Sequence, residues 1–214
     1  MYKTALGEIK GDLPEANVLR FITKQSWVRT ILEIGTMDGT GSTTTIIESL
    51  QSRSDFEETS FISIDASETA IRVAHNNLHP LSKNVKLIHG TLLHKDSPLL
   101  IFSLTEEETK WLRDDVHQRL TAPSLLETIP ELIDLAIIDG GEFTSFNDYL
   151  VLRERTCLLY LHDITKRKNT LTLKTARQDG YIEMFNDGNA SVLVNSGVAV
   201  KRRLNLIELF KQFT

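Results

Sequence analysis

The chain has 214 residues, 41% of them hydrophobic, with a formal net charge of −5 and a pI near 5.7. This composition can bury one substantial core, and no stretch resembles an interdomain linker, so we expect a single domain over residues 1–214. The acidic balance argues against a nucleic-acid partner, because binding phosphates takes clustered Lys and Arg side chains.

The sequence also lacks the usual marks of export. Residues 1–17, MYKTALGEIKGDLPEAN, contain no apolar core of signal-peptide length, and no segment is apolar over the length of a membrane span. The one cysteine, Cys157, lies in the apolar run CLLYL, which favours a buried inert thiol and excludes a disulfide framework. We therefore expect a cytoplasmic protein without a membrane partner.

Five short apolar runs, each ended by turn residues, predict strands that are buried on both faces of a parallel sheet. They are residues 30–35, 61–65, 85–89, 133–138 and 157–161. The stretches between them favour helices, which a parallel sheet needs as crossovers. Asp12-Leu-Pro-Glu15 resembles a helix start with an acidic cap and a proline in the first turn. The alternation predicts a doubly wound α/β sandwich.

Residues 91–130 are too many for a plain connection between two strands. They contain the stretch EEETKWLRDDVHQRL, which predicts a helix. Two arrangements stay open: a cap or lid insertion that carries Trp111, or a helix packed on the sheet with Trp111 in the core.

The C-terminal part reads as a series of strands joined by tight turns. The runs YIEMF (181–185), ASVLV (190–194) and VAVKRR (198–203) are separated by NDGN and NSG. Such spacing predicts an antiparallel hairpin that closes the sheet. Which two of the three runs form the main pair stays open.

The stretch ILEIGTMDGTGST, residues 31–43, runs from the first apolar segment into glycines, which is typical of a nucleotide-binding turn. A Walker-type phosphate loop is disfavoured because no Lys precedes the Ser-Thr pair. A dinucleotide fingerprint is disfavoured because β-branched Thr44 stands at its third glycine, where the helix must pack closely on the strand. The pattern that remains is acidic-x-Gly-x-x-x-Gly, formed by Glu33, Gly35 and Gly39.

With this pattern the chain resembles the class I S-adenosylmethionine-dependent methyltransferases, whose first strand ends in the same motif. The resemblance implies a Rossmann-like, mostly parallel seven-stranded sheet in the order 3-2-1-4-5-7-6 with a C-terminal antiparallel hairpin, and S-adenosylmethionine as cofactor. It implies that Asp65 accepts hydrogen bonds from both ribose hydroxyls, although Asp65 would otherwise serve as a helix cap. The implied cofactor-binding residues are Glu33, Gly35, Thr36, Gly39, Asp65, Ala66, Gly90, Thr91 and Asp139.

The pieces IIDGGEFTSFNDYLVL and YLHDIT look most like a subgroup related to macrocin O-methyltransferase and the cephalosporin-hydroxylase-like proteins. This resemblance implies O-methylation of a small-molecule acceptor, such as a sugar or natural-product hydroxyl. The subgroup shows an acid where Gly141 stands, and this departure puts a metal site in question.

Asp139 and Asp163 end two strands that the implied order makes neighbours. Two carboxylates there suit Mg²⁺, which would lower the pKa of a bound hydroxyl. The alternative is that Asp139 fixes a turn and Asp163 caps a helix.

His162 is the first candidate for the base that removes the acceptor proton, because histidine titrates near neutral pH and this one stands at a strand end. Glu142 is the second candidate. Side chains alternate along a strand, so His162 and Asp163 should not point the same way if the strand continues through both. The predicted catalytic residues are His162, Asp139 and Glu142, and the predicted metal ligands are Asp139 and Asp163.

Three other functions stay open. An NAD(P)-dependent reductase or epimerase is disfavoured by Thr44 and by the lack of a Tyr-x-x-x-Lys pair. A methyltransferase-like protein that binds cofactor or a partner without catalysis is compatible with Gly141. Nucleic-acid methylation lacks both a basic stripe and an Asn-Pro-Pro-aromatic segment. The acceptor has no recognisable motif, since acceptor pockets come from variable loops, and a homo-oligomer stays open.

Overall fold

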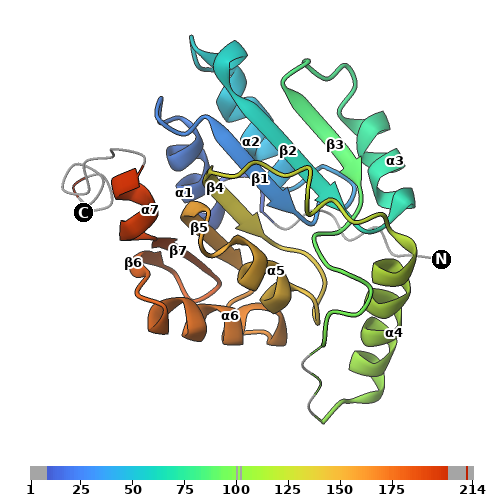
Figure 1. The fold of residues 1–214 in the computed structure, drawn as a ribbon. Coiled ribbons are helices and arrows are strands. Elements are labelled where there is room, and N and C mark those ends of the chain that lie inside the picture. The colour runs from blue at the N-terminus through green and yellow to red at the C-terminus, as the bar shows by residue number, and fades with distance from the viewer. Residues whose placement is uncertain (1–8, 100, 102, 202–210, 212–214) are drawn as a thin grey trace.

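The computed structural model describes residues 9–99, 101, 103–201 and 211. In this part of the chain, seven strands form one sheet in the order β3-β2-β1-β4-β5-β7-β6 (Figure 1). The strands are β1 (Thr30–Ile34), β2 (Ser60–Asp65), β3 (Val85–His89), β4 (Ile133–Ile138), β5 (Thr156–His162), β6 (Ile182–Asn186) and β7 (Ala190–Val194). The predicted fold class and strand order are confirmed.

Strands β1 to β5 pair in parallel, so their carboxyl ends meet at one edge of the sheet. Ile34 at the end of β1 lies opposite Ile138 of β4, which in turn lies opposite Leu161 of β5. On the other side of β1, Ile34 lies opposite Ile64 of β2. The residues that follow these strands are therefore neighbours in space.

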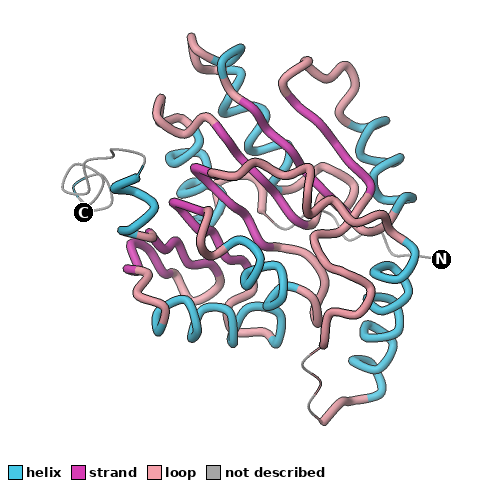
Figure 2. Tube along the Cα trace, viewed as in Figure 1, coloured by secondary structure: helices cyan, strands magenta, loops and turns pink. Residues whose placement is uncertain are grey.

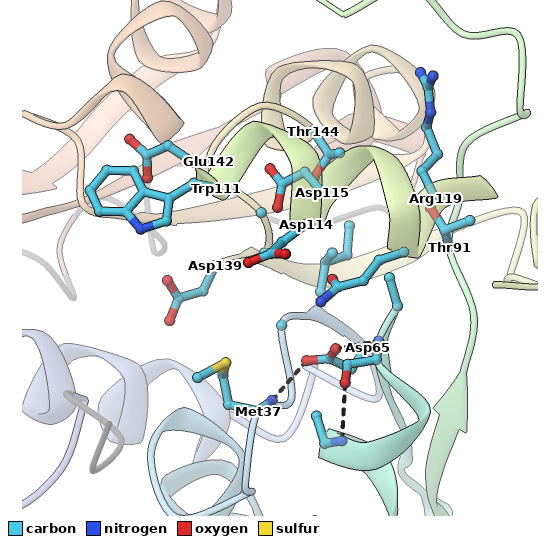
Figure 3. Close-up of a pocket in the computed structure, with 18 of the residues that line it drawn as sticks. Met37, Asp65, Thr91, Trp111, Asp114, Asp115, Arg119, Asp139, Glu142 and Thr144 are labelled. Carbon is cyan, nitrogen blue, oxygen red and sulfur yellow. Dashed lines mark hydrogen bonds between the residues drawn. The ribbon is translucent and has the colours of Figure 1, made fainter. Parts of the chain in front are cut away.

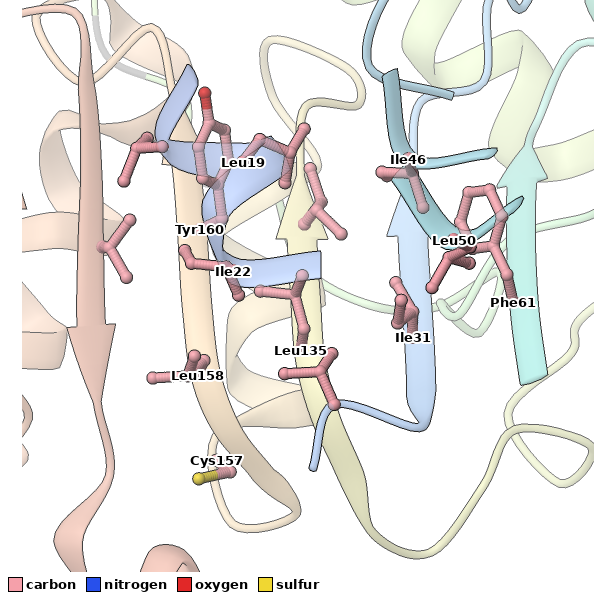
Figure 4. Close-up of a cluster of buried hydrophobic side chains, with 14 of the residues drawn as sticks. Leu19, Ile22, Ile31, Ile46, Leu50, Phe61, Leu135, Cys157, Leu158 and Tyr160 are labelled. Carbon is pink, nitrogen blue, oxygen red and sulfur yellow. The ribbon is translucent and has the colours of Figure 1, made fainter. Parts of the chain in front are cut away.

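Helices cover both faces of the sheet. They are α1 (Pro14–Thr23), α2 (Ser42–Gln51), α3 (Glu68–Asn77), α4 (Glu106–Thr121), α5 (Ser145–Leu152), α6 (Arg167–Gln178) and α7 (Ser196–Lys201), with a 3-10 turn η1 (Phe56–Glu58). Alternate strand residues supply the two cores: Ile31 packs with α1 and α2 (Figure 4), and Leu32 packs with α5 and α6. Both faces are thus buried, which explains why the strands read as nearly continuous apolar runs.

Helix α4 differs from the others because none of its residues is buried. It begins with a capping box, in which Thr105 and Glu108 each accept a hydrogen bond from the other's backbone N–H. Trp111 is 42% exposed and belongs to neither core. Loops, pink in Figure 2, run between the strand ends and α4. The helix thus lies beyond the carboxyl edge of the sheet.

Two local predictions are corrected. Residues 198–201 form part of helix α7 instead of a strand. The helix begins there because Asn195 Oδ1 accepts hydrogen bonds from the N–H groups of Gly197 and Val198. Residues 202 and 203 lie outside the described residues. The hairpin pair is therefore β6 and β7. Helix α1 has the predicted proline at its first position, but its N-cap residue is Leu13 and not the acidic Asp12.

Cys157 is buried, as predicted. Among the described residues, no helix combines the length and the apolar character that crossing a membrane requires.

Candidate functional site

A cavity of about 920 Å³ opens at the carboxyl edge of the parallel strands (Figure 3). Its lining comes from the segments that follow β1, β2, β3, β4 and β5, and from α4 on the opposite side. These residues include Gly35, Met37, Asp65, Ala66, Gly90, Thr91, Trp111, Asp115, Asp139, Gly141, Glu142, Asp148 and Asp163. Open α/β sheets bind their ligands in this crevice.

Glu33 does not line this cavity. Its carboxylate is fully buried and accepts hydrogen bonds from the hydroxyls of Ser42, Thr43 and Ser63 at 2.5 to 2.7 Å. Burial raises the pKa of Glu33 to about 7, although these three hydrogen bonds act in the opposite direction. The predicted contact with the cofactor is corrected: Glu33 fastens the start of α2 to β1 and β2.

Gly35 does line the cavity, and its backbone conformation requires glycine. Its φ is +105°, and a Cβ atom there would lie 2.4 Å from the carbonyl oxygen of Asp139. Thr36 and Gly39, which were also predicted to bind cofactor, lie outside the lining. The Thr36 hydroxyl is buried 2.6 Å from that of Ser63, and Gly39 packs against Leu78.

Asp65 stands at the end of β2 with both carboxylate oxygens fixed (Figure 3). Oδ2 accepts from the N–H of Met37 at 2.9 Å, and Oδ1 accepts from the N–H of Ser67 at 2.8 Å. Burial raises the pKa of Asp65, although the two backbone hydrogen bonds act in the opposite direction. The N-cap residue of α3 is Ser67, and Asp65 supports the start of this segment through its hydrogen bond with the Ser67 N–H, so the alternative role as a cap is met in part. Ala66, Gly90 and Thr91 lie in the same lining.

His162 lies behind the cavity wall. It is 2% exposed, its Nδ1 is 3.2 Å from Asp139 Oδ1, and its Nε2 is 3.0 Å from the side-chain amide of Asn189. Burial lowers the pKa of His162, but the hydrogen bond and charge of Asp139 raise it above its usual value overall. His162 therefore does not line the cavity and lies behind Asp139, which does, so the geometry does not provide the predicted direct contact with an acceptor.

Asp163 and His162 turn toward the same cluster, and the expected alternation does not apply because it held only for a strand that continues through both. The strand ends at His162, and Asp163 has a φ of +57°, so its side chain leaves the strand pattern. One ligand atom from each of Asp139, His162 and Asp163 lies within 4.8 Å of the others. This spacing alone would suit a metal ion.

Lys168 of α6 occupies that cluster. Its Nζ is 2.6 Å from Asp139 Oδ1 and 3.2 Å from Asp163 Oδ2, while Lys166 Nζ is 2.7 Å from Asp163 Oδ1. Burial lowers the pKa of Lys168, but Asp139 and Asp163 raise it above its usual value overall, so the ammonium stays charged. A divalent ion would meet this charge at close range, so these residues do not fit the predicted Mg²⁺.

Glu142 lines the cavity, and its Oε1 accepts the N–H of Lys168 at 3.1 Å in the first turn of α6. At Gly141, a Cβ atom would lie 2.7 Å from both carboxylate oxygens of Asp115. Asp115 of α4 therefore fills the space in which a side chain at position 141 would start. Its Oδ2 accepts the N–H of Phe143 at 2.8 Å.

Sequence reasoning missed Lys168, Asp115 and Asp148. Burial raises the pKa of Asp115 to about 6 and that of Asp148 to about 8. The missing acid at Gly141 was a signal for Asp115, because a carboxylate from elsewhere can fill the same space. The basic run after His162-Asp163 was the signal for Lys168.

No family model matches the chain, and no curated protein matches its sequence. Solved structures do share its fold. A Bacillus cereus O-methyltransferase in complex with S-adenosylhomocysteine has a TM-score of 0.54 at 12% identity, over 89% of this chain and 84% of that one. An S-adenosylhomocysteine-bound Podospora anserina methyltransferase, PaMTH1, has a TM-score of 0.56 at 11% identity, over 86% and 79%.

A candidate caffeoyl-CoA O-methyltransferase from Staphylococcus aureus has a TM-score of 0.56 at 16% identity, covering 87% of this chain and 85% of that one. At these identities the likeness concerns the backbone and not the individual site residues. The chain therefore has the fold of the class I S-adenosylmethionine-dependent methyltransferases.

Proposed function

We propose that the protein is an S-adenosylmethionine-dependent methyltransferase that O-methylates a small molecule, such as a sugar or natural-product hydroxyl. The observation that carries the proposal is Asp65, an acid with both oxygens fixed at the end of β2, in a cavity shared with Gly35. The specific kinship to the macrocin O-methyltransferase subgroup and a cytoplasmic location are parts of the same proposal.

The cavity residues fit the cofactor. Asp65 would accept hydrogen bonds from the ribose hydroxyls, and Ala66, Gly90 and Thr91 would border the adenine. The absence of a Cβ at Gly35 lets the backbone approach the methionine part. S-adenosylmethionine supplies an electrophilic methyl group on a sulfonium.

The chain's own residues orient the acceptor and receive its proton. Burial opposes ionisation of Asp139, but Lys168 and His162 hold its pKa below the usual value. Asp139 is therefore a charged hydrogen-bond acceptor that aligns the hydroxyl. Glu142 also lines the cavity and is the carboxylate that would take up the acceptor proton.

A turnover assay tests this function. We expect S-adenosylhomocysteine to form from S-adenosylmethionine in the presence of members of a panel of sugars and phenols. Asp139 was also expected to bind cofactor, but in this proposal it orients the acceptor. Asp139→Asn should therefore lower turnover by roughly 10² to 10⁴ while S-adenosylhomocysteine affinity changes little.

Asp96→Asn, at an exposed carboxylate outside the cavity lining, is the matched control and should keep full turnover. Equal turnover in wild type and Asp139→Asn would contradict the role of Asp139. Binding of NAD(P) in place of S-adenosylhomocysteine would contradict the proposed function itself.

A further inference from the structure

We propose that Lys168 takes the place of a divalent metal ion in this site, as a built-in cation that binds Asp139 and Asp163 and makes methyl transfer independent of metal. The inference deepens the proposed function and rests on it for its catalytic part. Lys168 is a positioning residue here, because it acts through Asp139 and does not itself line the cavity.

The geometry of the cluster supports this replacement. Asp139 and Asp163 stand at the ends of β4 and β5, where a metal would be shared between neighbouring strands. Lys168 Nζ lies between them, 2.6 Å from one carboxylate and 3.2 Å from the other. Asp139 Oδ1 also contacts His162 Nδ1 at 3.2 Å. Asp139 Oδ1 and both carboxylate oxygens of Asp163 are thus already engaged by cationic or imidazole nitrogens.

The charges of the cluster also support it. Asp139 and Asp163 carry two negative charges, and Lys166 and Lys168 carry two positive charges within 4 Å of them. His162 contributes a further positive charge when it is protonated. The two lysines therefore already balance the charges of Asp139 and Asp163, which a divalent ion would need from these two oxygen ligands.

The backbone of α6 holds Lys168 in this position. Lys168 lies in the first turn of α6, where its N–H donates to Glu142 Oε1 at 3.1 Å. The side-chain amide of the next residue, Asn169, donates to the carbonyls of Ile138 and His162 at 3.0 and 2.6 Å. These bonds fasten the start of α6 to the ends of β4 and β5, so the ammonium is aimed at the cluster.

The second carboxylate oxygen of Asp139, Oδ2, is left for the acceptor. Lys168 and His162 both contact Oδ1, and no hydrogen bond from a described residue reaches Oδ2. Asp139 lines the cavity, so Oδ2 is available to an acceptor hydroxyl. Lys168 therefore keeps Asp139 ionised and oriented, which is the contribution that a bound metal would otherwise make to alignment.

Binding of Mn²⁺, measured by electron paramagnetic resonance, tests the inference without an acceptor. Wild type should bind no Mn²⁺ at this cluster with a Kd below about 1 mM, which corresponds to a binding free energy of about −4 kcal/mol. Lys168→Ala removes the ammonium and leaves Asp139, His162 and Asp163 as a ligand set, so it should bind Mn²⁺ at least roughly tenfold more tightly. The double variant Lys168→Ala/Asp139→Asn should lose that binding.

Two controls separate charge from helix damage. Lys168→Arg keeps a cation at the site and should still exclude Mn²⁺, and Lys174→Ala alters an exposed lysine of the same helix and should behave as wild type. Once an acceptor is found, wild-type turnover should be unchanged by a chelator.

The inference would be overturned if wild type bound Mn²⁺ and Asp139→Asn abolished this binding. This outcome can be observed without any Lys168 variant. A folded Lys168→Ala protein without Mn²⁺ binding would overturn it as well. S-adenosylhomocysteine titrations on the same samples keep the two proposals apart. Wild type that excludes Mn²⁺ but binds no S-adenosylhomocysteine would contradict the proposed function and support only the cation replacement.

Discussion

Asp148 and Asp115 bring two carboxyl groups to the cavity wall from different helices. Asp148 is 2% exposed, and no described residue forms an ion pair or hydrogen bond with its carboxyl group. Burial is the main cause that raises its pKa to about 8, and the nearby charge of Asp115 adds to it. Asp148 is therefore protonated at neutral pH in the folded protein.

This protonation predicts a dependence of stability on pH. The folded pKa of Asp148 is above the unfolded value near 3.8, so its stabilising effect is complete below about pH 4 and is lost as pH rises toward 8. Asp148→Asn removes this loss. As the pH rises from 4 to 8, the unfolding free energy of wild type should therefore fall relative to that of the variant by up to about 1.4 kcal/mol for each pH unit.

Urea unfolding at a series of pH values measures the difference. Asp114→Asn, at an exposed carboxylate of α4, is the control and should follow wild type. A constant gap in unfolding free energy between wild type and Asp148→Asn from pH 4 to pH 8 would contradict the buried, protonated carboxyl.

At the scale of residues, the sequence allows the positions of side chains that end or directly follow a strand to be predicted. Asp65 and Asp139 could be placed because the carboxyl ends of parallel strands share one edge. Lys168 could not be placed, because its side chain reaches the site from a helix whose starting residue depends on Glu142 and Asn169. Glu33 fits the motif, but its side-chain partners depend on packing that the motif does not encode.

At the scale of elements, the segments that follow β1 and β4 meet where the cavity begins. The Asp139 N–H donates to the Ile34 carbonyl at 2.9 Å, and a Cβ atom at Gly35 would lie 2.4 Å from the Asp139 carbonyl oxygen. The strands themselves were predictable because burial on both faces leaves continuous apolar runs. Helix α7 was not predictable, because a run as short as VAV shows neither a helical nor a strand periodicity of apolar residues. The hydrogen bonds that Asn195 accepts at the start of α7 decide the conformation of this run.

The β1–β4 junction makes a matched prediction for two glycines with positive φ. Gly35→Ala would place a Cβ atom 2.4 Å from a backbone oxygen, whereas Gly180→Ala, at φ +86°, meets nothing within 4 Å. Gly180→Ala should lose only about 1 to 2 kcal/mol of unfolding free energy, from backbone strain. Gly35→Ala should lose more than about 4 kcal/mol or fail to fold. Equal losses in urea unfolding would show that the junction is looser than described.

At the scale of the whole molecule, the strand order puts five parallel carboxyl ends around one cavity and leaves the antiparallel hairpin of β6 and β7 at the far edge. Topology thus selects the location of the site, while individual side chains select the ligand. The central claim is that this cavity binds S-adenosylmethionine, with Asp65 holding the ribose.

Calorimetric titration with S-adenosylhomocysteine tests that claim most directly, on wild type and on Asp65→Ala. Wild type should bind one equivalent per chain. Asp65→Ala should bind roughly ten to a hundredfold more weakly, because losing hydrogen bonds to a charged acceptor costs about 1.5 to 3 kcal/mol. A folded wild type that binds no S-adenosylhomocysteine, or an Asp65→Ala protein with unchanged affinity, would contradict the account.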